Sequence, residues 1–345
     1  MRSENRGCEL AVRGLKPGEL IRFASIARRY YLEDRPKTEI ADEFGISRFK
    51  VSRILRESRE RGLVRIEIKL PAEIDAELSD RLARAWSLHQ AIVVTTADEP
   101  AELNREHLGE VAAGLLSELV EEGDVVGIGW GRTLAAMTTF LTSLAPCTVV
   151  QLTGAVGTVE VNESSVEIVR RVAAAAGRTA FPIYAPLIVD SPETAAALRR
   201  QPHVAEAMQL FDHLTKAVVA IGSWNPPNSQ LRESMDVTER AKLQSLGVRA
   251  EICATLVDDA GQAVAGDLME RAIAISADQL RRIPEVVAVA GGRSKIEAIR
   301  AVLTGGFVTS LVTDATVARG LLQDEPASSA SQGRRDAARL VHAGG

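Results

Sequence analysis

Apolar residues recur at helical intervals through the first part of the chain. Residues 19–32 place them three and four positions apart, which predicts a helix, and the turn at residues 34–36 ends it. A second, shorter helix is predicted over residues 38–44. Gly45 stops it, because glycine can adopt the left-handed conformation of a tight turn between helices. Ser47 is then a typical N-cap for a third helix.

This third helix, predicted over residues 48–61, has one apolar face and one basic face. The spacing from Ala41 through Gly45 and Val51 to Ile54 matches a helix-turn-helix, whose second helix lies in the DNA major groove. An ordinary helical hairpin with charged faces is the alternative. In the first interpretation, the residues expected to contact DNA are Thr38, Ser47, Arg48, Phe49, Lys50 and Arg53.

Two further segments extend the predicted DNA-binding domain, which we place at residues 19–71. Residues 62–68 alternate apolar and polar positions, as in the β-wing of a winged helix-turn-helix, and Pro71 ends the strand. Residues 73–86 are amphipathic, which predicts a connecting helix within residues 72–90 that could also pair with another subunit.

The rest of the chain alternates between β-rich apolar runs and helical patterns. This alternation predicts a doubly wound α/β domain over residues 91–323. The runs that we interpret as strands are Ala91–Thr95, Asp124–Ile128, Thr148–Leu152, Ala217–Ile221, Val286–Ala290 and Val308–Val312.

Three glycine-containing loops follow strands of this predicted sheet, at residues 127–133, 153–157 and 290–295. Ligands of doubly wound sheets bind at the carboxyl ends of the strands, where glycines allow backbone N–H groups to approach an anion. The first loop is neither a dinucleotide fingerprint nor a P-loop, and a purely structural turn would also account for it. Lys295 is unfavourably placed at a helix start, which points to a ligand, although a solvated lysine is the alternative.

Charge is distributed unevenly along the 345 residues. The first 70 carry 17 Lys and Arg against 11 Asp and Glu, a net of +6, whereas the whole chain has a net charge of −5. A basic segment on an acidic protein favours a polyanionic partner, although a solvated basic surface would give the same balance. Hydrophobic residues make up 46% and charged residues 25%, as in globular proteins.

Other functional classes lack support in the sequence. The three cysteines are widely separated and the five histidines form no cluster, so we expect neither a metal site nor a Ser-His-Asp hydrolase. No long apolar run or signal peptide is present, and we therefore expect a cytoplasmic protein without membrane contact. Residues 1–18 and 324–345 are polar and rich in small residues, and both are expected to be disordered tails.

Together these motifs resemble the SorC family of sugar-responsive transcriptional regulators, from about residue 22 to residue 322. The segments that carry the resemblance are TEIADEFGISRFKVSRIL, GLVRIEI, GDVVGIGWGRTL, VVQLTGAVG, APLIVDSPE, AIGSW, RRIPEVVAVAGGRSK and LVTDATVARGLL. The resemblance implies an effector domain shaped like sugar-phosphate isomerases and deaminases, which binds a sugar, polyol or sugar phosphate without turnover. It also implies homodimers or homotetramers on operator DNA. We expect no cofactor.

Carried over by position, the resemblance implies ligand contacts at Gly129, Gly131, Arg132, Thr133, Thr153, Gly154, Glu163, Glu251 and Lys295. Two positions depart from the family pattern. Several relatives have Lys or Arg where Thr153 stands, which weakens the expected grip on a phosphate. Relatives also commonly have Gly-Asp where this chain has Ala250-Glu251, so the carboxylate is one methylene longer.

Two other functions remain open at this stage. One is an isomerase- or deaminase-like enzyme fused to a DNA-binding module, with Glu163, Glu251 or Asp258 as the acid or base. The other is a protein-interaction module, for which only the connecting helix argues. A regulator of a carbohydrate or polyol operon explains both halves of the chain, because an enzyme has no evident use for the helix-turn-helix.

Overall fold

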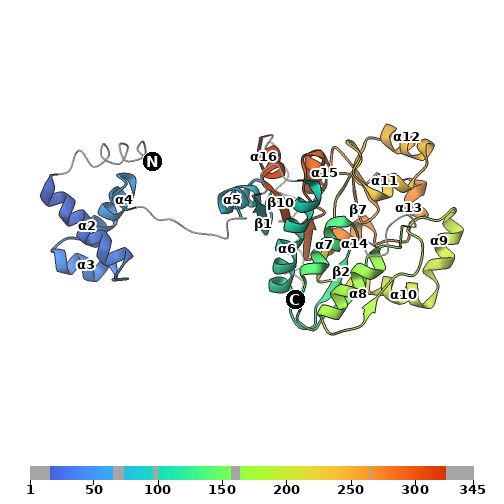
Figure 1. Cartoon of the computed structure of the whole chain (residues 1–345), viewed down its shortest axis with the longest axis horizontal. Coiled ribbons are helices and arrows are strands. Elements are labelled where there is room, and N and C mark those ends of the chain that lie inside the picture. Colours follow the sequence, from blue (N-terminus) through green and yellow to red (C-terminus); the bar gives the residue numbers. More distant parts are fainter. Residues whose placement is uncertain (1–15, 65–73, 96–99, 157–163, 265, 324–345) are drawn as a thin grey trace, which may run out of the picture. The chain divides into compact units, whose positions relative to one another are not determined.

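The computed structural model describes residues 16–64, 74–95, 100–156, 164–264 and 266–323. The chain divides into two compact units, Met1–Lys69 and Leu70–Gly345 (Figure 1). We describe each unit separately.

The N-terminal unit contains three helices, α2 (Pro17–Tyr31), α3 (Lys37–Phe44) and α4 (Arg48–Glu60). Each lies within two residues of the range predicted from apolar spacing. The buried side chains that hold the helices together are Ile26, Ala27, Ile40, Ala41, Val51, Ile54 and Leu55.

The α3–α4 turn has the conformation that its residues favour. Gly45 ends α3 with φ +60°, and the Ile46 N–H donates to the Ala41 carbonyl oxygen at 2.9 Å. Ser47 caps α4, since its Oγ accepts a hydrogen bond from the Lys50 N–H at 3.2 Å. The predicted wing falls mostly outside the described residues, which end at Val64 in this unit.

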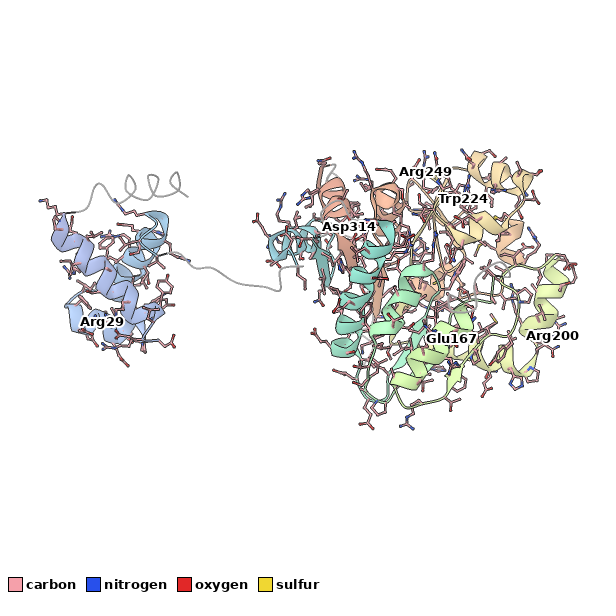
Figure 2. All side chains as sticks on the ribbon, in the orientation of Figure 1. Arg29, Glu167, Arg200, Trp224, Arg249 and Asp314 are labelled. Atoms are coloured by element: carbon pink, nitrogen blue, oxygen red, sulfur yellow. The ribbon has the colours of Figure 1, made fainter. Side chains whose placement is uncertain are left out.

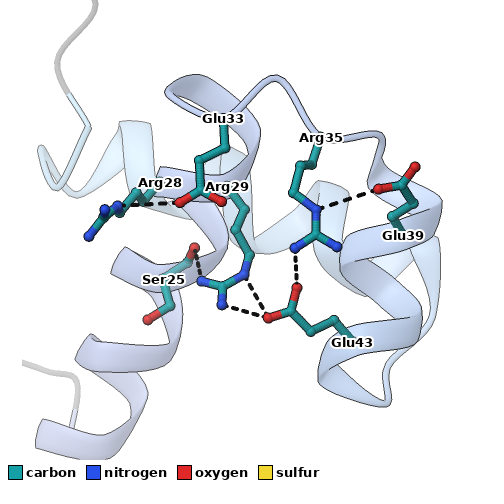
Figure 3. A network of polar contacts seen from close by, with 7 residues as sticks. All are labelled: Ser25, Arg28, Arg29, Glu33, Arg35, Glu39 and Glu43. Atoms are coloured by element: carbon teal, nitrogen blue, oxygen red, sulfur yellow. Dashed lines mark hydrogen bonds and ion pairs between the residues drawn. The ribbon is translucent and has the colours of Figure 1, made fainter.

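An ion-pair network joins α2 to α3 on the surface of this unit (Figure 3). The Glu43 carboxylate accepts from Arg29 Nε at 2.7 Å and also pairs with Arg35. The hydrogen bond from Arg29 lowers the pKa of Glu43 below its ordinary value of 4.5. The network links α2 to α3, and its partial exposure limits its effect on stability.

A seven-stranded parallel sheet forms the centre of the larger unit, with the order β1-β10-β9-β5-β2-β3-β4. Six of its strands coincide with the predicted apolar runs, and β4 was not predicted. The strands are β1 (Gln90–Val94), β2 (Val125–Ile128), β3 (Thr148–Gln151), β4 (Ala180–Phe181), β5 (Lys216–Val219), β9 (Glu285–Val289) and β10 (Ser310–Asp314).

Helices cover both faces of this sheet, as a doubly wound fold requires. One face packs against α6 (Ala101–Leu119), α7 (Arg132–Phe140) and α8 (Ser165–Ala175), coloured green in Figure 1. The opposite face packs against α5 (Ala76–Ala85), α9 (Pro192–Arg199), α10 (Pro202–Gln209), α14 (Ala277–Arg282), α15 (Ile296–Thr304) and α16 (Ala315–Gln323).

A second, antiparallel sheet of three short strands lies beside a separate apolar cluster that includes Trp224 (Figure 2). Its strands are β6 (Gly222–Ser223), β7 (Val248–Ile252) and β8 (Thr255–Asp258), none of which was predicted. The remaining helical segments are η2 (Leu210–His213), α11 (Gln230–Ser234), α12 (Val237–Ser245), α13 (Asp267–Glu270) and η3 (Arg293–Lys295).

The helix expected to connect the two domains belongs to the larger unit. Leu78 and Leu82 on α5 are buried in the core of that unit, and the Asp75 side chain caps the helix by accepting from the Leu78 N–H. The amphipathic pattern is therefore satisfied within the chain. Of the predicted tails, residues 1–15 and 324–345 lie outside the described residues, whereas α2 already begins at Pro17. No helix in the described parts of the chain has the length and apolar character needed to cross a membrane.

Candidate functional site

A cavity of about 210 Å³ opens at the carboxyl ends of β2, β5 and β9. In this sheet β2 and β5 are neighbours. After β2 the chain continues to β3 on one side of this pair, whereas after β5 the next strand of the sheet is β9, on the opposite side. The loops after β2 and β5 therefore diverge, and such a divergence is where doubly wound sheets bind ligands. The lining residues used below are Asn104, Arg105, Gly131, Arg132, Thr133, Asn228, Ser229, Glu251, Gly292, Ser294 and Lys295.

The first wall of the cavity is the turn between β2 and α7. Gly131 has φ +135°, a conformation that L side chains rarely adopt, and a Cβ there would lie 3.1 Å from the Ala220 Cβ. Arg132 and Thr133 form the first turn of α7, whose free N–H groups and helix dipole favour an anion. Arg132 Nη2 donates to the Asn228 Oδ1 at 3.1 Å, and Asn228 Nδ2 donates to the Ser294 Oγ at 3.2 Å.

Lys295 supplies a second cation from the loop after β9. Its Nζ donates to the Ile221 carbonyl oxygen at 2.7 Å, which holds the ammonium group at the cavity wall. Burial lowers the pKa of Lys295 to about 8, with a smaller contribution from the nearby positive charge of Arg132. An anionic ligand bound here would reduce the repulsion between Lys295 and Arg132 and favour the charged form of the lysine.

Glu251 faces the same cavity from β7 and is only 5% exposed. Its Oε1 accepts the Ala254 N–H at 2.8 Å, across a turn in which Cys253 and Ala254 both have positive φ. Burial raises the pKa of Glu251 to about 7. A Cβ on Gly222 would lie 2.8 Å from Glu251 Oε2, so glycine is needed beside this carboxyl group.

Asp314, labelled in Figure 2, is a buried carboxylate at the end of β10 that holds the third glycine loop. It accepts hydrogen bonds from the Gly292 N–H, from Asn104 Nδ2 and from the Val317 N–H at the start of α16. The loop is thereby tied to α6 and α16.

The structure brings together five of the nine predicted ligand residues, namely Gly131, Arg132, Thr133, Glu251 and Lys295. Gly129, Thr153 and Gly154 do not line this cavity. Gly129 and Gly154 lie in tight backbone packing, where a Cβ would lie 3.3 Å from the Val218 oxygen and 2.6 Å from the Pro186 oxygen, respectively. Thr153 is fully buried. Glu163 and its neighbour Asn162 lie outside the described residues.

Sequence reasoning missed several polar residues of the cavity, including Asn104, Arg105, Asn228 and Ser229. The first two lie on α6, where polar residues alternate with apolar ones as on any surface helix. The other two follow Pro226 and Pro227 in a loop after β5, and a polar loop after a predicted strand was the available signal.

The six residues predicted to contact DNA are all exposed, from Thr38 on α3 to Arg53 on α4. On the opposite side of α4, Val51, Ile54 and Leu55 are buried against α2 and α3. Arg53 lies 3.7 Å from Glu57 in an exposed pair that a phosphate or base could replace at little cost. The helix thus presents a basic face supported by an apolar one, as a recognition helix does.

Comparisons with known proteins agree with both halves of this description. The family model of a sugar-binding domain, Sugar-bind, matches residues 71–323. The chain is 31% identical over 309 residues to the uncharacterized transcriptional regulator YjhU of Escherichia coli (strain K12), covering 86% of this chain and 92% of that protein. It is 27% identical to the sorbitol operon regulator of Klebsiella pneumoniae over 310 residues, covering 87% and 97%.

A solved structure gives the same result. The full-length sorbitol operon regulator SorC from Klebsiella pneumoniae superposes with a TM-score of 0.69 at 25% identity, covering 88% of this chain and 99% of that one. The match must include at least part of the N-terminal unit, because it covers more residues than the segment 71–323 and the residues after it together hold. The chain therefore belongs to the SorC family of transcriptional regulators with a sugar-binding domain.

Proposed function

We propose that the protein regulates a carbohydrate or polyol operon by binding operator DNA through α4 and an anionic sugar, such as a sugar phosphate, in the cavity beside α7. The observation that carries the choice of ligand is the meeting of Arg132, Lys295 and the α7 N-terminus at one wall. Three sources of positive potential in a partly buried site favour a negatively charged group.

The opposite side of the cavity supports recognition of hydroxyl groups. Glu251 accepts hydrogen bonds as a carboxylate and donates one when protonated, while Asn228 and Ser229 can both donate and accept. A sugar bound with its anionic group at Arg132 would place its hydroxyls among these side chains. Thr153 does not contribute a cation here, so the phosphate grip rests on Arg132 and Lys295.

The buried Glu251 carboxyl group, with a pKa of about 7, is a feature that favours an enzyme. We propose binding without turnover, because Glu251 Oε1 already holds the Ala254 N–H of a strained turn and thus has a structural task. Incubating the protein with sugar phosphates and assaying for isomer or released ammonia tests this choice. Product formation that depends on Glu251 would contradict it.

On DNA, we propose that α4 of a homodimer or homotetramer occupies the major groove of each half-site, with centres about 34 Å apart or multiples of that distance. Arg48 and Arg53 can each pair with a guanine, and Lys50 can reach a phosphate. A coupling of about 1–3 kcal/mol between effector and operator would change operator affinity about 5- to 150-fold.

Thermal unfolding with matched pairs of free and phosphorylated sugars or polyols tests the ligand class. A ligand at 100 times its Kd adds about 2.7 kcal/mol of stability to the unit that binds it. We expect the phosphorylated member of one pair to raise Tm and the free sugar to do so weakly. Stabilisation by the free sugar or polyol alone would contradict an anionic effector.

A further inference from the structure

A large aromatic side chain lies exposed among the cations of α4. Phe49 is in the first turn of this helix and is 79% exposed. The core of the unit does not need its ring, because Val51, Ile54 and Leu55 already cover the inner face of α4. A phenyl ring left in water does not gain the free energy of burial, so a partner that covers it would form a more stable complex.

The neighbouring Arg48 packs against this ring. Its guanidinium carbon lies 5.8 Å from the ring centroid, within the range of a cation–π contact. The contact places the cation beside the ring. Both side chains belong to the N-terminal turn, which is the part of a recognition helix that reaches the base edges.

Phe49 cannot form a hydrogen bond with a base, so any sequence preference it carries must come from apolar contact. In the major groove, the C5-methyl group of thymine is the apolar group that distinguishes one base pair from another. We infer that Phe49 reads the methyl group of a thymine in each operator half-site, while Arg48 beside it contacts an adjacent phosphate or guanine. This inference rests on the proposed binding of α4 in the major groove.

The inference has a chemical corollary that separates it from hydrogen-bond readout. Uracil pairs with adenine as thymine does and differs only by the missing methyl group. Cytosine methylated at C5 places a methyl group at the equivalent edge of a G·C pair. Operator affinity should therefore follow the methyl group and not the hydrogen-bonding pattern of the base.

The experiment uses the full-length protein and an operator selected from random duplexes. Each thymine of the selected half-site is replaced in turn by deoxyuridine, and Kd is measured at constant salt. One thymine per half-site should respond with affinity about fourfold weaker, the loss expected for one buried methyl group. Replacing that A·T pair by G·C should lower affinity further, and C5-methylation of the new cytosine should restore part of it.

Substitution at Phe49 shows whether this residue is the reader. Phe49→Ala should weaken binding to the thymine operator and make Kd the same for thymine and uracil at the sensitive position. Phe49→Leu should keep part of the discrimination, because leucine retains an apolar contact. Leu32→Ala is the matched control, since Leu32 is 77% exposed in the same unit but follows α2, and it should leave the discrimination unchanged.

Two outcomes would overturn the inference. If no thymine responds to uracil, or if Phe49→Ala still discriminates thymine from uracil, Phe49 does not read a methyl group. Arg53→Ala tests the proposed function separately, because it should weaken operator binding whether or not Phe49 reads a methyl group. If the protein selects no DNA sequence, or Arg53→Ala leaves operator affinity unchanged, the proposed role of α4 itself is wrong and the inference fails with it.

Discussion

The two units of the chain present their positive charges in opposite ways. On α4, Arg48, Lys50 and Arg53 extend from an exposed face. In the cavity, Arg132 and Lys295 are partly buried and hydrogen-bonded to neighbouring loops. Exposed cations suit a polyanion whose phosphates are spread along a groove. Fixed, desolvated cations suit one small anion, whose charge is then strongly felt. In the proposed function, this difference assigns the extended polyanion to one unit and the small anionic effector to the other.

The largest effect is expected from the core of the N-terminal unit. Ile26→Ala removes a fully buried side chain and should cost about 2–5 kcal/mol. A unit this small has little stability to lose, so its unfolding transition should disappear from calorimetry together with operator binding. The stabilisation of the larger unit by effector should persist. Loss of the effector response in this variant would show that the two units do not fold independently.

The response to pH should also differ between the units. Burial raises the pKa of Glu251 to about 7, so the folded state keeps this proton while the unfolded chain releases it near 4.5. The free energy of unfolding of the larger unit should therefore fall as pH rises from 4.5 to 7, by about 1.4 kcal/mol per pH unit. Denaturant titrations of Glu251→Gln should lack this decline.

The N-terminal unit should behave in the opposite sense. Hydrogen bonding from Arg29 lowers the pKa of Glu43, so its contribution is present above pH 4.5 and is lost as pH falls through the lowered value. A free energy of unfolding of the N-terminal unit that fell as pH rose from 4.5 to 7, measured by the same denaturant titrations, would contradict this difference between the units.

A smaller effect is expected from the cavity cation. Arg132→Ala removes a charged hydrogen-bond donor. Because a hydrogen bond to a charged group contributes about 1.5–3 kcal/mol, this change should weaken binding of an anionic effector about 10- to 100-fold. Operator affinity without effector should not change, as measured by gel shift. The matched control is Arg170→Ala on α8, where the exposed arginine pairs with Glu167 and does not line the cavity. Equal losses in both variants would exclude a specific role for Arg132.

The smallest effects come from two equivalent caps. Ser47 accepts the Lys50 N–H at the start of α4, and Ser164 accepts the Glu167 N–H at the start of α8. Changing either serine to alanine should cost about 1 kcal/mol. Calorimetry should show Ser47→Ala lowering only the transition of the N-terminal unit and Ser164→Ala only that of the larger unit. A shift of both transitions by one cap would contradict their independence.

The helices and most parallel strands could be predicted because each depends on nearby residues. Gly45 and Ser47 set the ends of α3 and α4 through their own backbone and side-chain preferences. The strands of the parallel sheet are buried on both sides, so they stand out as apolar runs. By contrast, β4 and β6 have two residues each, too few to produce a pattern, and their pairing depends on distant segments.

The cavity was only partly predictable for a related reason. Arg132 and Lys295 lie beside glycines that follow strands, so local sequence indicates them. Asn228 joins the site only because its side chain bridges Arg132 and Ser294, each more than 60 residues away. Gly129 and Gly154 resemble ligand loops in sequence, yet close backbone packing explains them. Glycine permits a close approach, and the sequence does not show whether a ligand or the backbone makes it.

Asp314 gives the cavity a connection to the helix that follows the DNA-binding unit in sequence. One of its oxygens accepts the Gly292 N–H at the cavity wall, and the other accepts the Val317 N–H in the first turn of α16. The α16 helix in turn packs against α5, the first helix described after residue 73. A ligand that displaces Gly292 must either break its bond to Asp314 or move α16 with it. In the proposed function, a ligand that moves Gly292 and α16 would therefore also move α5, the helix that follows the DNA-binding unit in sequence.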